Sequence, residues 1–462
     1  MPLDRRSVLS AGLGAGLGAG LDAGLVGARA AHAGPRRDEA LNSTLRAALS
    51  PAELGLEANS ERDQAEALQR AIDEAANRGV PLLLPPGRFR ASALVLRPGT
   101  RLVGAARTTI LEYAGGAAFL TGEGAHGLLL QDLVLDGAYK RLDGDALLSL
   151  DTSRSVALRG LEVVRSAANG ITLKACAGSV SDCAISGAMQ AGLHSQDATG
   201  LDIFHNQFVD CANNGIQVWR TAAGEDGSLV ANNRIARIRA DSGGTGENGN
   251  GINVFRSGNV LVSGNRISDC AYSAIRGNAA SDIQMVANSC TRLGEVALYA
   301  EFAFEGALIA NNLVDSAATG VSVTNFNDGG RLALVQGNIL RNLFRREEEP
   351  EDKRGEGITV EADTIVAGNV VENAPTAGLV IGWGTYVREV VATGNLIRKA
   401  RVGILVSQDA AAGACLIANN MIAGAANGGI RAMDASGRPI GPDLARADSS
   451  DKRLSLAGNL AV

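Results

Sequence analysis

A short phrase recurs along this chain: an apolar pair, then Gly-Asn or Asn-Asn, then a second pair that ends in an apolar residue. It occurs, for example, at residues 230–235, 309–314 and 417–422, and a Gly-Ile phrase accompanies it at positions such as Gly215 and Gly251. Such a repeat predicts a solenoid, because each unit can bury its apolar residues only by stacking on its neighbours.

The repeat length and its apolar pattern predict the kind of coil. The asparagines at the second position of the phrase, or its equivalent, follow one another at intervals of 23 to 32 residues: Asn206, Asn233, Asn265, Asn288, Asn312, Asn338, Asn369, Asn395 and Asn420. Apolar and polar residues alternate in segments such as Ile216–Trp219, which is the period of a β-strand. A coil of about 24 residues with two or three short strands predicts a parallel β-helix of about 12 coils. We expect the asparagines to be structural, because a stacked amide can pair the backbone groups of a buried turn.

The N-terminal 33 residues have the features of an export signal. Two adjacent arginines, Arg5 and Arg6, precede a Gly- and Ala-rich apolar stretch, and Ala31–Ala33 forms an Ala-x-Ala cleavage site. This pattern predicts a twin-arginine signal peptide over residues 1–33 and a periplasmic or secreted protein. No apolar run after residue 33 is long enough for a transmembrane segment.

Charge and cysteine content narrow the partners further. The net charge is −6 with no polybasic run, so we expect no nucleic-acid partner. The six cysteines show no zinc-ligand spacing, and we expect buried thiols: Cys176, Cys183, Cys211, Cys270, Cys290 and Cys415. Export permits disulfides, and Cys176 with Cys183 is the one pair that we leave open as a candidate.

The segment before the repeats predicts a cap for the solenoid. Residues 34–60 look like an irregular lead-in, and residues 63–79 form an amphipathic helical pattern that starts at an N-capping aspartate and stops at Gly79. Residues 61–104 would then hold the capping helix and the first coil, and residues 105–462 the β-helix repeats. A cap of this kind protects the open end of a solenoid from edge association.

This N-terminal arrangement resembles a known superfamily. A helix, the Leu-Pro-Pro-Gly-x-Phe phrase at residues 84–89 and a Gly-turn-Leu-x-Gly phrase at residues 99–104 are similar to the start of the pectate-lyase-like right-handed β-helix proteins. Together with the twin-arginine signal, the chain resembles a family of exported repeat proteins in that superfamily. The resemblance implies a right-handed parallel β-helix over residues 61–460. Many members act on acidic polysaccharides, and others are phage tail or adhesin modules.

The motifs of the polygalacturonase-type hydrolases in this superfamily are missing. Asparagine, not aspartate, precedes the Gly-Ile phrase at Asn169, Asn214 and Asn250, and the chain contains neither Asp-Asp nor Gly-His-Gly. Hydrolysis by paired carboxylates of that type is therefore disfavoured. Lyase or epimerase chemistry instead needs a cation that neutralises a sugar carboxylate and an acid or base near the carbon beside it.

The candidate site lies on the outward face of the Gly-Ile strands. Stacking of the coils should bring its polar and aromatic residues into columns, between the insertions at residues 239–249 and 345–356. We predict Tyr299, Arg276 and Glu301 as the catalytic set. The predicted polysaccharide-binding residues are Trp219, Arg220, Phe255, Arg256, Asn278, Asn325, Glu361 and Trp383.

Two functions remain open from the sequence. The first is a lyase- or epimerase-like enzyme for an acidic polysaccharide, in which Arg256 and Arg276 bind carboxylates, Tyr299 is the acid or base, and Glu301 with Glu361 positions substrate or holds Ca²⁺. The second is a non-catalytic glycan-binding or structural module of the cell envelope. The fold does not discriminate between them.

Overall fold

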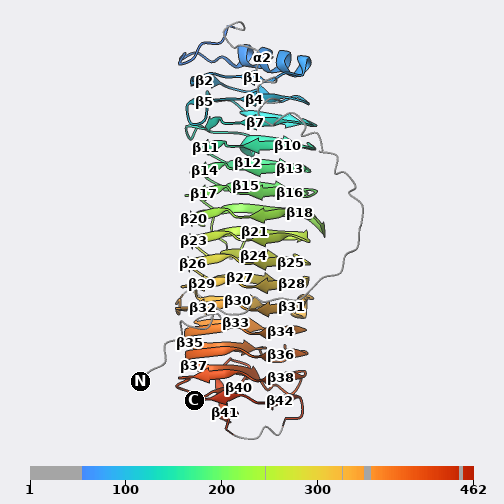
Figure 1. The fold of residues 1–462 in the computed structure, drawn as a ribbon, viewed down its shortest axis with the longest axis vertical. Helices are drawn as coiled ribbons and strands as arrows, with labels where there is room; N and C mark the ends of the chain where they lie inside the picture. The colour runs from blue at the N-terminus through green and yellow to red at the C-terminus, as the bar shows by residue number, and fades with distance from the viewer. Residues whose placement is uncertain (1–54, 245, 325, 348–354, 447–450) are drawn as a thin grey trace, which may run out of the picture. The chain divides into compact units, whose positions relative to one another are not determined.

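The computed structural model describes residues 55–244, 246–324, 326–347, 355–446 and 451–462. They form a stack of short strands, with one helix at the N-terminal end of the stack (Figure 1). The predicted signal peptide and the lead-in up to residue 54 lie outside the described residues. Among the helices that are described, none is long and apolar enough to cross a membrane.

Each coil contributes one strand to each of three ladders, except that the last described coil has no strand in the third. The pre-asparagine ladder contains 15 strands, namely β1 (Leu82–Leu83), β4 (Arg101–Val103), β7 (Leu129–Gln131), β10 (Val156–Arg159), β13 (Gly178–Ser181), β16 (Leu201–Phe204), β19 (Leu229–Ala231), β22 (Leu261–Ser263), β25 (Ile283–Val286), β28 (Glu305–Ala310), β31 (Arg331–Gln336), β34 (Thr364–Ala367), β36 (Val390–Thr393), β38 (Cys415–Ala418) and β42 (Leu454–Ala457).

The post-asparagine ladder follows the asparagine turn of each coil. Its strands are β2 (Gly87–Ala91), β5 (Thr109–Tyr113), β8 (Val134–Asp136), β11 (Glu162–Val164), β14 (Ala184–Ser186), β17 (Gln207–Val209), β20 (Arg234–Ile238), β23 (Arg266–Cys270), β26 (Ser289–Leu293), β29 (Leu313–Asp315), β32 (Ile339–Arg341), the first parts of β35 (Val370–Ile381) and β37 (Leu396–Ser407), β39 (Met421–Ala423) and β43 (Leu460–Ala461).

The Gly-Ile ladder completes the coil. It comprises β3 (Leu94–Val95), β6 (Leu120–Glu123), β9 (Ala146–Asp151), β12 (Asn169–Lys174), β15 (Ala191–Gln196), β18 (Asn214–Glu225), β21 (Asn250–Gly258), β24 (Ile275–Asn278), β27 (Val296–Glu301), β30 (Thr319–Val323), β33 (Glu356–Val360), the second parts of β35 and β37, and β40 (Ile430–Met433). A 3-10 turn, η2 (Phe326–Asp328), lies on a connection, and β41 (Pro439–Asp443) pairs antiparallel with β40.

The parallel β-helix predicted from the repeat is confirmed. Coil-to-coil pairing is parallel throughout the three ladders, and the stack has about 14 turns, slightly more than the predicted 12 or so. The inward residues of all three ladders form one continuous aliphatic core along the stack.

The asparagine column is a continuous hydrogen-bonded chain through the buried turns. Each Oδ1 accepts the backbone N–H and the Nδ2 group of the asparagine one coil earlier, as Asn369 does from Asn338 at 3.0 and 2.9 Å. Each Nδ2 also donates to a carbonyl of the preceding coil, as Asn338 does to Ile309 at 3.0 Å. The column runs from Asn206 to Asn459, one coil beyond the last asparagine recognised in the sequence.

The residue before each column asparagine adopts a left-handed backbone conformation. Its φ is 56° at Asn232 and 66° at Gly264, which explains why the phrase reads Asn-Asn or Gly-Asn. Asp132, Gly160 and Asp182 share this conformation, so they take the place before the column and not a place in it.

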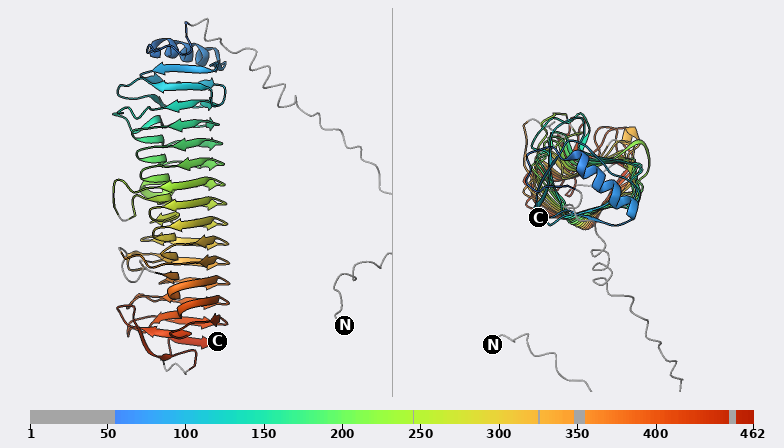
Figure 2. Two further views of the ribbon diagram at one scale, coloured as in Figure 1. Left: turned by 90° about the vertical axis from the view of Figure 1, so that its left-hand side faces the viewer. Right: turned by 90° about the horizontal axis from the view of Figure 1, so that it is seen from above.

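The predicted capping helix is α2 (Ala65–Arg78), and it lies across the end of the coils when viewed along the stack (Figure 2). It begins two residues after the predicted cap Asp63, whose Oδ1 accepts the N–H of Ala65 at 2.9 Å. It ends at the predicted Gly79, where φ is 65°. Its buried residues are the predicted stripe of Leu68, Ala71, Ile72 and Ala75.

All six cysteines are buried free thiols, so the candidate Cys176–Cys183 disulfide is not formed. Cys183 occupies the column position one coil before Asn206, and its backbone N–H donates to Asn206 Oδ1 at 2.9 Å. Burial raises the pKa of the Cys183 thiol to about 12, which keeps it protonated and unreactive at neutral pH.

The asparagine column predicts a large stability loss on truncation. Replacement Asn338→Ala removes the hydrogen bond that the Ile309 carbonyl accepts from Nδ2 and the one that the Asn312 backbone N–H donates to Oδ1, and a buried polar group left unpaired costs about 1–3 kcal/mol. We expect the free energy of unfolding to fall by at least about 2 kcal/mol in urea denaturation. The exposed Asn427, replaced by alanine in the same way, is the control; equal losses at both positions would contradict a structural column.

Candidate functional site

The residues predicted on the Gly-Ile face fall into two adjacent outward columns. Asn253, Arg276 and Tyr299 are register partners on β21, β24 and β27. Phe255, Asn278 and Glu301 form the second column on the same strands. The prediction that stacking brings these side chains together is therefore confirmed in their placement, because the residue after each inward isoleucine points outward at every coil.

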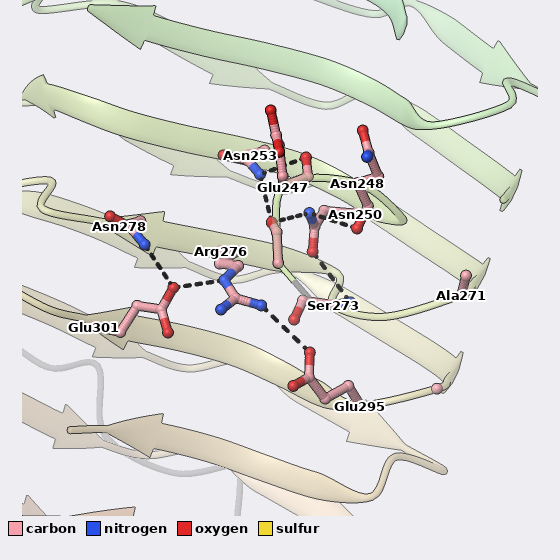
Figure 3. Close-up of polar contacts among 12 residues, drawn as sticks. Glu247, Asn248, Asn250, Asn253, Ala271, Ser273, Arg276, Asn278, Glu295 and Glu301 are labelled. Atoms are coloured by element: carbon pink, nitrogen blue, oxygen red, sulfur yellow. Dashed lines mark hydrogen bonds and ion pairs between the residues drawn. The ribbon is translucent and has the colours of Figure 1, made fainter. Parts of the chain in front are cut away.

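Arg276 lies at the centre of a covered charge cluster (Figure 3). Its Nε donates to Glu301 Oε1 at 2.6 Å, and its Nη1 lies 3.4 Å from Glu295 Oε2. Asn278 Nδ2 donates to the same Glu301 oxygen at 2.8 Å, and the guanidinium lies 4.8 Å from the centre of the Tyr299 ring. Arg276 is 6% exposed and Glu301 only 1% exposed.

A loop closes over this cluster, and it requires glycine at one position. Gly246 has φ of 133°, and a Cβ there would lie 2.3 Å from the Arg276 guanidinium carbon. The asparagines that stand where the hydrolases have aspartate hold this loop: Asn250 Nδ2 donates to the Gly246 carbonyl at 2.9 Å, and Asn214 Nδ2 to the Glu247 carbonyl at 2.9 Å. They bind the loop backbone.

The glutamates of the cluster therefore already pair with the positive charge of Arg276. Burial lowers the pKa of the guanidinium, but the adjacent Glu301 carboxylate outweighs this effect, and the pKa is raised overall. A substrate carboxylate could bind Arg276 only if the Gly246 loop moved and a glutamate were displaced, so the predicted carboxylate-binding role of Arg276 lacks geometric support.

A strip of aromatic side chains precedes this cluster along the stack. His194, Trp219 and Phe255 lie edge to face in sequence, with ring centres 5.4 and 5.7 Å apart. Arg256 stacks on Phe255 at 4.7 Å and donates to the Thr221 carbonyl at 2.9 Å. The half-buried Arg220 instead turns to the Ala198 carbonyl, at 3.2 Å. The four predicted binding residues among them, Trp219, Arg220, Phe255 and Arg256, thus form a surface separate from the covered cluster.

A cavity lies further toward the C-terminus of the stack. Its volume is about 520 Å³, and it follows the outward face of β27, β30, β33, β35, β37 and β40. We call it the C-terminal pocket. Polar lining residues come from its earlier coils: Tyr299, Thr319, Ser322, Thr324, Glu356, Thr359 and Glu361.

The opposite end of the pocket is apolar and closed by the β40–β41 hairpin. Val380, Val402, Leu405 and Met433 pack there into a small cluster separate from the core of the solenoid. The tip of the hairpin is held by Asp434, whose carboxylate accepts the backbone N–H groups of Ser436 and Arg438 at 2.9 and 3.0 Å. The Ser436 hydroxyl also donates to this carboxylate. Its hydrogen bond is the largest cause that lowers the pKa of Asp434 to about 2, and the backbone bonds add to the effect.

Three arginines line the pocket, in different states of pairing. Arg438 is bonded to Asp434 at 3.2 Å, and Arg345 donates to Thr376 Oγ1 at 3.2 Å. The guanidinium of Arg401 is exposed and makes no hydrogen bond or ion pair with the described part of the chain. At the pocket mouth Trp383 is 47% exposed, and its ring stacks on that of Tyr386 with centres 6.0 Å apart.

The structure thus redistributes the predicted site. Tyr299, Glu361 and Trp383 line the C-terminal pocket, whereas Arg276, Asn278 and Glu301 lie in the covered cluster beside it. The predicted Asn325 lies outside the described residues. Sequence reasoning missed Glu356, Val402, Met433, Arg401 and Arg438. Of these residues, only Glu356 had a signal in the sequence, because it ends one of the two predicted insertions. No repeat phrase in the sequence reveals that β41 folds back onto β40.

The described residues do not support the Ca²⁺ site that the sequence left as a possibility. Over the described ranges, no three His, Cys, Asp or Glu side chains come together as potential metal ligands. Glu301 is committed to Arg276 and Asn278, and Glu361 accepts the Phe326 backbone N–H at 2.9 Å. We therefore derive no step through a metal ion.

Comparison with known proteins places the fold. Residues 169–339 and 223–397 match the family described as right handed beta helix region, and the chain is a right-handed parallel β-helix. No protein of curated function matches the sequence significantly.

Several solved structures resemble the chain at low identity. The pre-mature gene product 12 of bacteriophage phi29 is 15% identical with a TM-score of 0.49, over 90% of this chain and 56% of its own length, so the chain spans little more than half of that protein. The alpha-1,3-glucanase catalytic unit of Streptomyces thermodiastaticus is 13% identical, with a TM-score of 0.45 and coverage of 90% and 69%. The mannuronan C-5 epimerase A-module of Azotobacter vinelandii is 15% identical, with a TM-score of 0.41 and coverage of 89% and 98%.

The covered cluster predicts that Arg276 is needed for folding. Replacement Arg276→Met leaves two buried carboxylates without their cation, and breaking a buried ion pair in this way costs about 3–5 kcal/mol. We expect a loss of this size in the free energy of unfolding, measured in urea. Arg292→Met, which removes an exposed arginine paired with Asp269, should have a much smaller effect. Equal effects at the two positions would contradict a buried network.

His194 predicts a pH dependence of stability. Burial is the main cause that lowers its pKa in the folded protein, while the hydrogen bond to Gln217 opposes the shift. The unfolded chain therefore takes up this proton at a higher pH, and the free energy of unfolding should decrease as the pH falls below about 6.5. In a Trp383→Phe variant, fluorescence of the neighbouring Trp219 should report the protonation with a midpoint below 6.5. His194→Gln should abolish the transition.

Proposed function

We propose that this chain is exported through the twin-arginine route and binds an acidic polysaccharide in the C-terminal pocket, where it acts in a lyase- or epimerase-like manner. The observation that carries the proposal is the composition of that pocket. An exposed Arg401 guanidinium shares it with the buried Tyr299 and Glu356, the half-buried Glu361 and the exposed Trp383. A cation for a carboxylate, a group that can transfer a proton and a ring for a sugar face are the components such chemistry needs.

Binding begins with Arg401 and Trp383. A guanidinium pairs a carboxylate through two parallel hydrogen bonds, and that of Arg401 has no partner in the described structure to displace first. Trp383 offers its ring at the mouth of the pocket, where a pyranose can stack on it. The closed apolar end at Met433 limits how far a chain can enter, so the pocket suits the end of a polysaccharide.

The chemistry of elimination balances without a co-reactant. A base removes the proton from the carbon next to the carboxylate, the electron pair forms a carbon–carbon double bond, and the glycosidic carbon–oxygen bond breaks. The departing oxygen takes up a proton. Arg401 would stabilise the carboxylate as it gains electron density, Glu356 would accept the first proton, and the Tyr299 phenol would donate the second. For epimerisation, Tyr299 would return a proton to the opposite face of the same carbon.

Arg276 and Glu301 act in this proposal as positioning residues. The Arg276 guanidinium packs against the Tyr299 ring, and Glu301 with Asn278 fixes the guanidinium in turn. The phenol is thereby held in one orientation on the wall of the pocket. Neither residue needs to touch substrate in this proposal.

A second candidate is a non-catalytic glycan-binding module of the envelope. It is favoured by the pairing of Arg276 with Glu295 and Glu301. Because of this pairing, Arg276 does not offer a free cation to a substrate carboxylate next to Tyr299. The Trp383–Tyr386 platform and Arg401 would then serve binding alone.

The experiment is a panel of acidic and neutral polysaccharides incubated with the purified protein. Ultraviolet absorbance detects the unsaturated product, proton exchange by NMR detects epimerisation, and calorimetry measures affinity. We expect Tyr299→Phe to abolish product while leaving the Kd for an acidic oligosaccharide nearly unchanged. Arg401→Gln should weaken binding about tenfold, which corresponds to about 1.4 kcal/mol.

Arg398→Gln is the matched control, because Arg398 is an exposed arginine that pairs with Glu372 outside the pocket. It should leave both binding and product formation unchanged. Binding that depends on Arg401 without any product would establish the second candidate. If no acidic polysaccharide binds, or if Arg398→Gln weakens binding as much as Arg401→Gln, both candidates are wrong.

A further inference from the structure

A shallow groove lies on a different face of the solenoid from the C-terminal pocket. It has a volume of about 420 Å³ and runs across β17, β20, β23 and β26 of the post-asparagine ladder. We call it the arginine groove. One row of its lining consists of register partners on consecutive coils, Gln207, Arg234, Arg266 and Ser289; the other row is Val209, Ala236, Ser268 and Thr291.

Two like charges face each other in this groove. Arg234 and Arg266 are direct register partners on adjacent parallel strands, and both are exposed. Their guanidinium groups make no hydrogen bond or ion pair within the ranges that the structure describes. Like charges directly opposite each other in a sheet are destabilising, so the free protein holds an unfavourable pair at this position.

The other arginines on this part of the ladder show that the exception is local. Arg237 binds Asp210 through two hydrogen bonds of 2.6 and 2.9 Å. Arg292 binds Asp269 in the same way, and Arg341 donates to Asp315 at 2.9 Å. The strands therefore pair these three arginines with an aspartate one coil away, whereas Arg234 and Arg266 have only each other, Gln207 and Ser289 as neighbours in their column.

We propose that the arginine groove is a second binding site for an anionic polysaccharide that lies along the solenoid axis. Arg234 and Arg266 bind its carboxylate or sulfate groups, and the anion relieves their mutual repulsion. Gln207, Ser268, Ser289 and Thr291 supply side-chain partners for the sugar hydroxyls. The coil spacing of about 4.8 Å allows successive coils to contact successive parts of one extended chain.

The lining favours a glycan over a nucleic acid. Single-stranded nucleic acids bind grooves in which bases stack on aromatic rings, and of the described residues that line this groove none is aromatic. Two unpaired guanidinium groups instead suit a ligand with one acidic group on each of a few sugars.

The site is independent of the proposed function, because it shares no residue with the C-terminal pocket. It would hold the body of a polysaccharide whether or not the pocket modifies its end. Failure of one site therefore does not imply failure of the other.

The test compares two double variants of the full-length protein that remove the same charge. Arg234→Gln with Arg266→Gln removes the unpaired arginines of the groove, and Arg237→Gln with Arg341→Gln removes two paired arginines of the same ladder that do not line it. Both are made in an Arg401→Gln background, so that the C-terminal pocket contributes little. The probes are polygalacturonate oligomers, dextran sulfate, neutral dextran and oligothymidylate, with binding measured by calorimetry at two salt concentrations.

We expect the groove variant to bind the acidic glycans at least about tenfold more weakly and with a smaller salt dependence, and the paired-arginine variant to retain affinity within about threefold. Comparison of the two acidic probes tells carboxylate from sulfate preference. Equal losses in the two variants, no loss in the groove variant, or tighter binding of oligothymidylate than of either glycan would overturn the proposal.

Thermal unfolding separates a binding role of these arginines from a structural role, because the two roles predict different changes in Tm on substitution. Because Arg234 and Arg266 repel each other, Arg234→Gln should leave the Tm unchanged or raise it in the absence of ligand. The parent protein should gain Tm on addition of the acidic oligomer, and the groove variant should not. A drop in Tm of the free Arg234→Gln protein would assign these arginines to folding and contradict the site.

Discussion

The rest of this structure depends on the pairing of buried backbone groups at the turn between the pre- and post-asparagine ladders. A parallel solenoid must change direction there in every coil, with its amides and carbonyls shielded from water, and an unpaired group would cost more than most side-chain contacts provide. The stacked asparagines solve this problem from one coil to the next. Because the solution is repeated and directional, it also fixes the register in which all outward columns stack.

That register is what makes a site possible on a protein with few aromatic side chains. Residues more than twenty positions apart become direct neighbours, so that Arg276 meets Glu301 and Tyr299 without any long-range loop. The same rule places Arg234 beside Arg266 on the neighbouring ladder. The partners of a charged side chain on this solenoid are therefore set by the side chains that the adjacent coils place in the same column. Among the paired strands that the structure describes, the column of Arg234 and Arg266 is the exception, because it sets two arginines side by side.

The outward face is organised by what covers it. The Gly246 loop buries the Arg276 cluster and turns a predicted substrate-binding arginine into a support for Tyr299. The β40–β41 hairpin covers the last coils and creates the apolar end of the C-terminal pocket. Between these two covers the polar wall of Tyr299, Glu356 and Glu361 remains within the cavity. Insertions, and not the repeat itself, decide which part of an otherwise uniform sheet can hold a ligand.

The sequence alone determined the coil, its parallel ladders, the structural asparagines and the capping helix, because these follow from local patterns that repeat or that mark helix ends, such as Gly79. It also placed Arg276, Tyr299 and Glu301 side by side, since register follows from the repeat. Only the tertiary structure showed that Arg276 is neutralised and that Glu356, Arg401 and Met433 share a pocket with Tyr299. The physical reason is that loop coverage and the antiparallel return of β41 depend on irregular segments, whose paths no periodic pattern encodes.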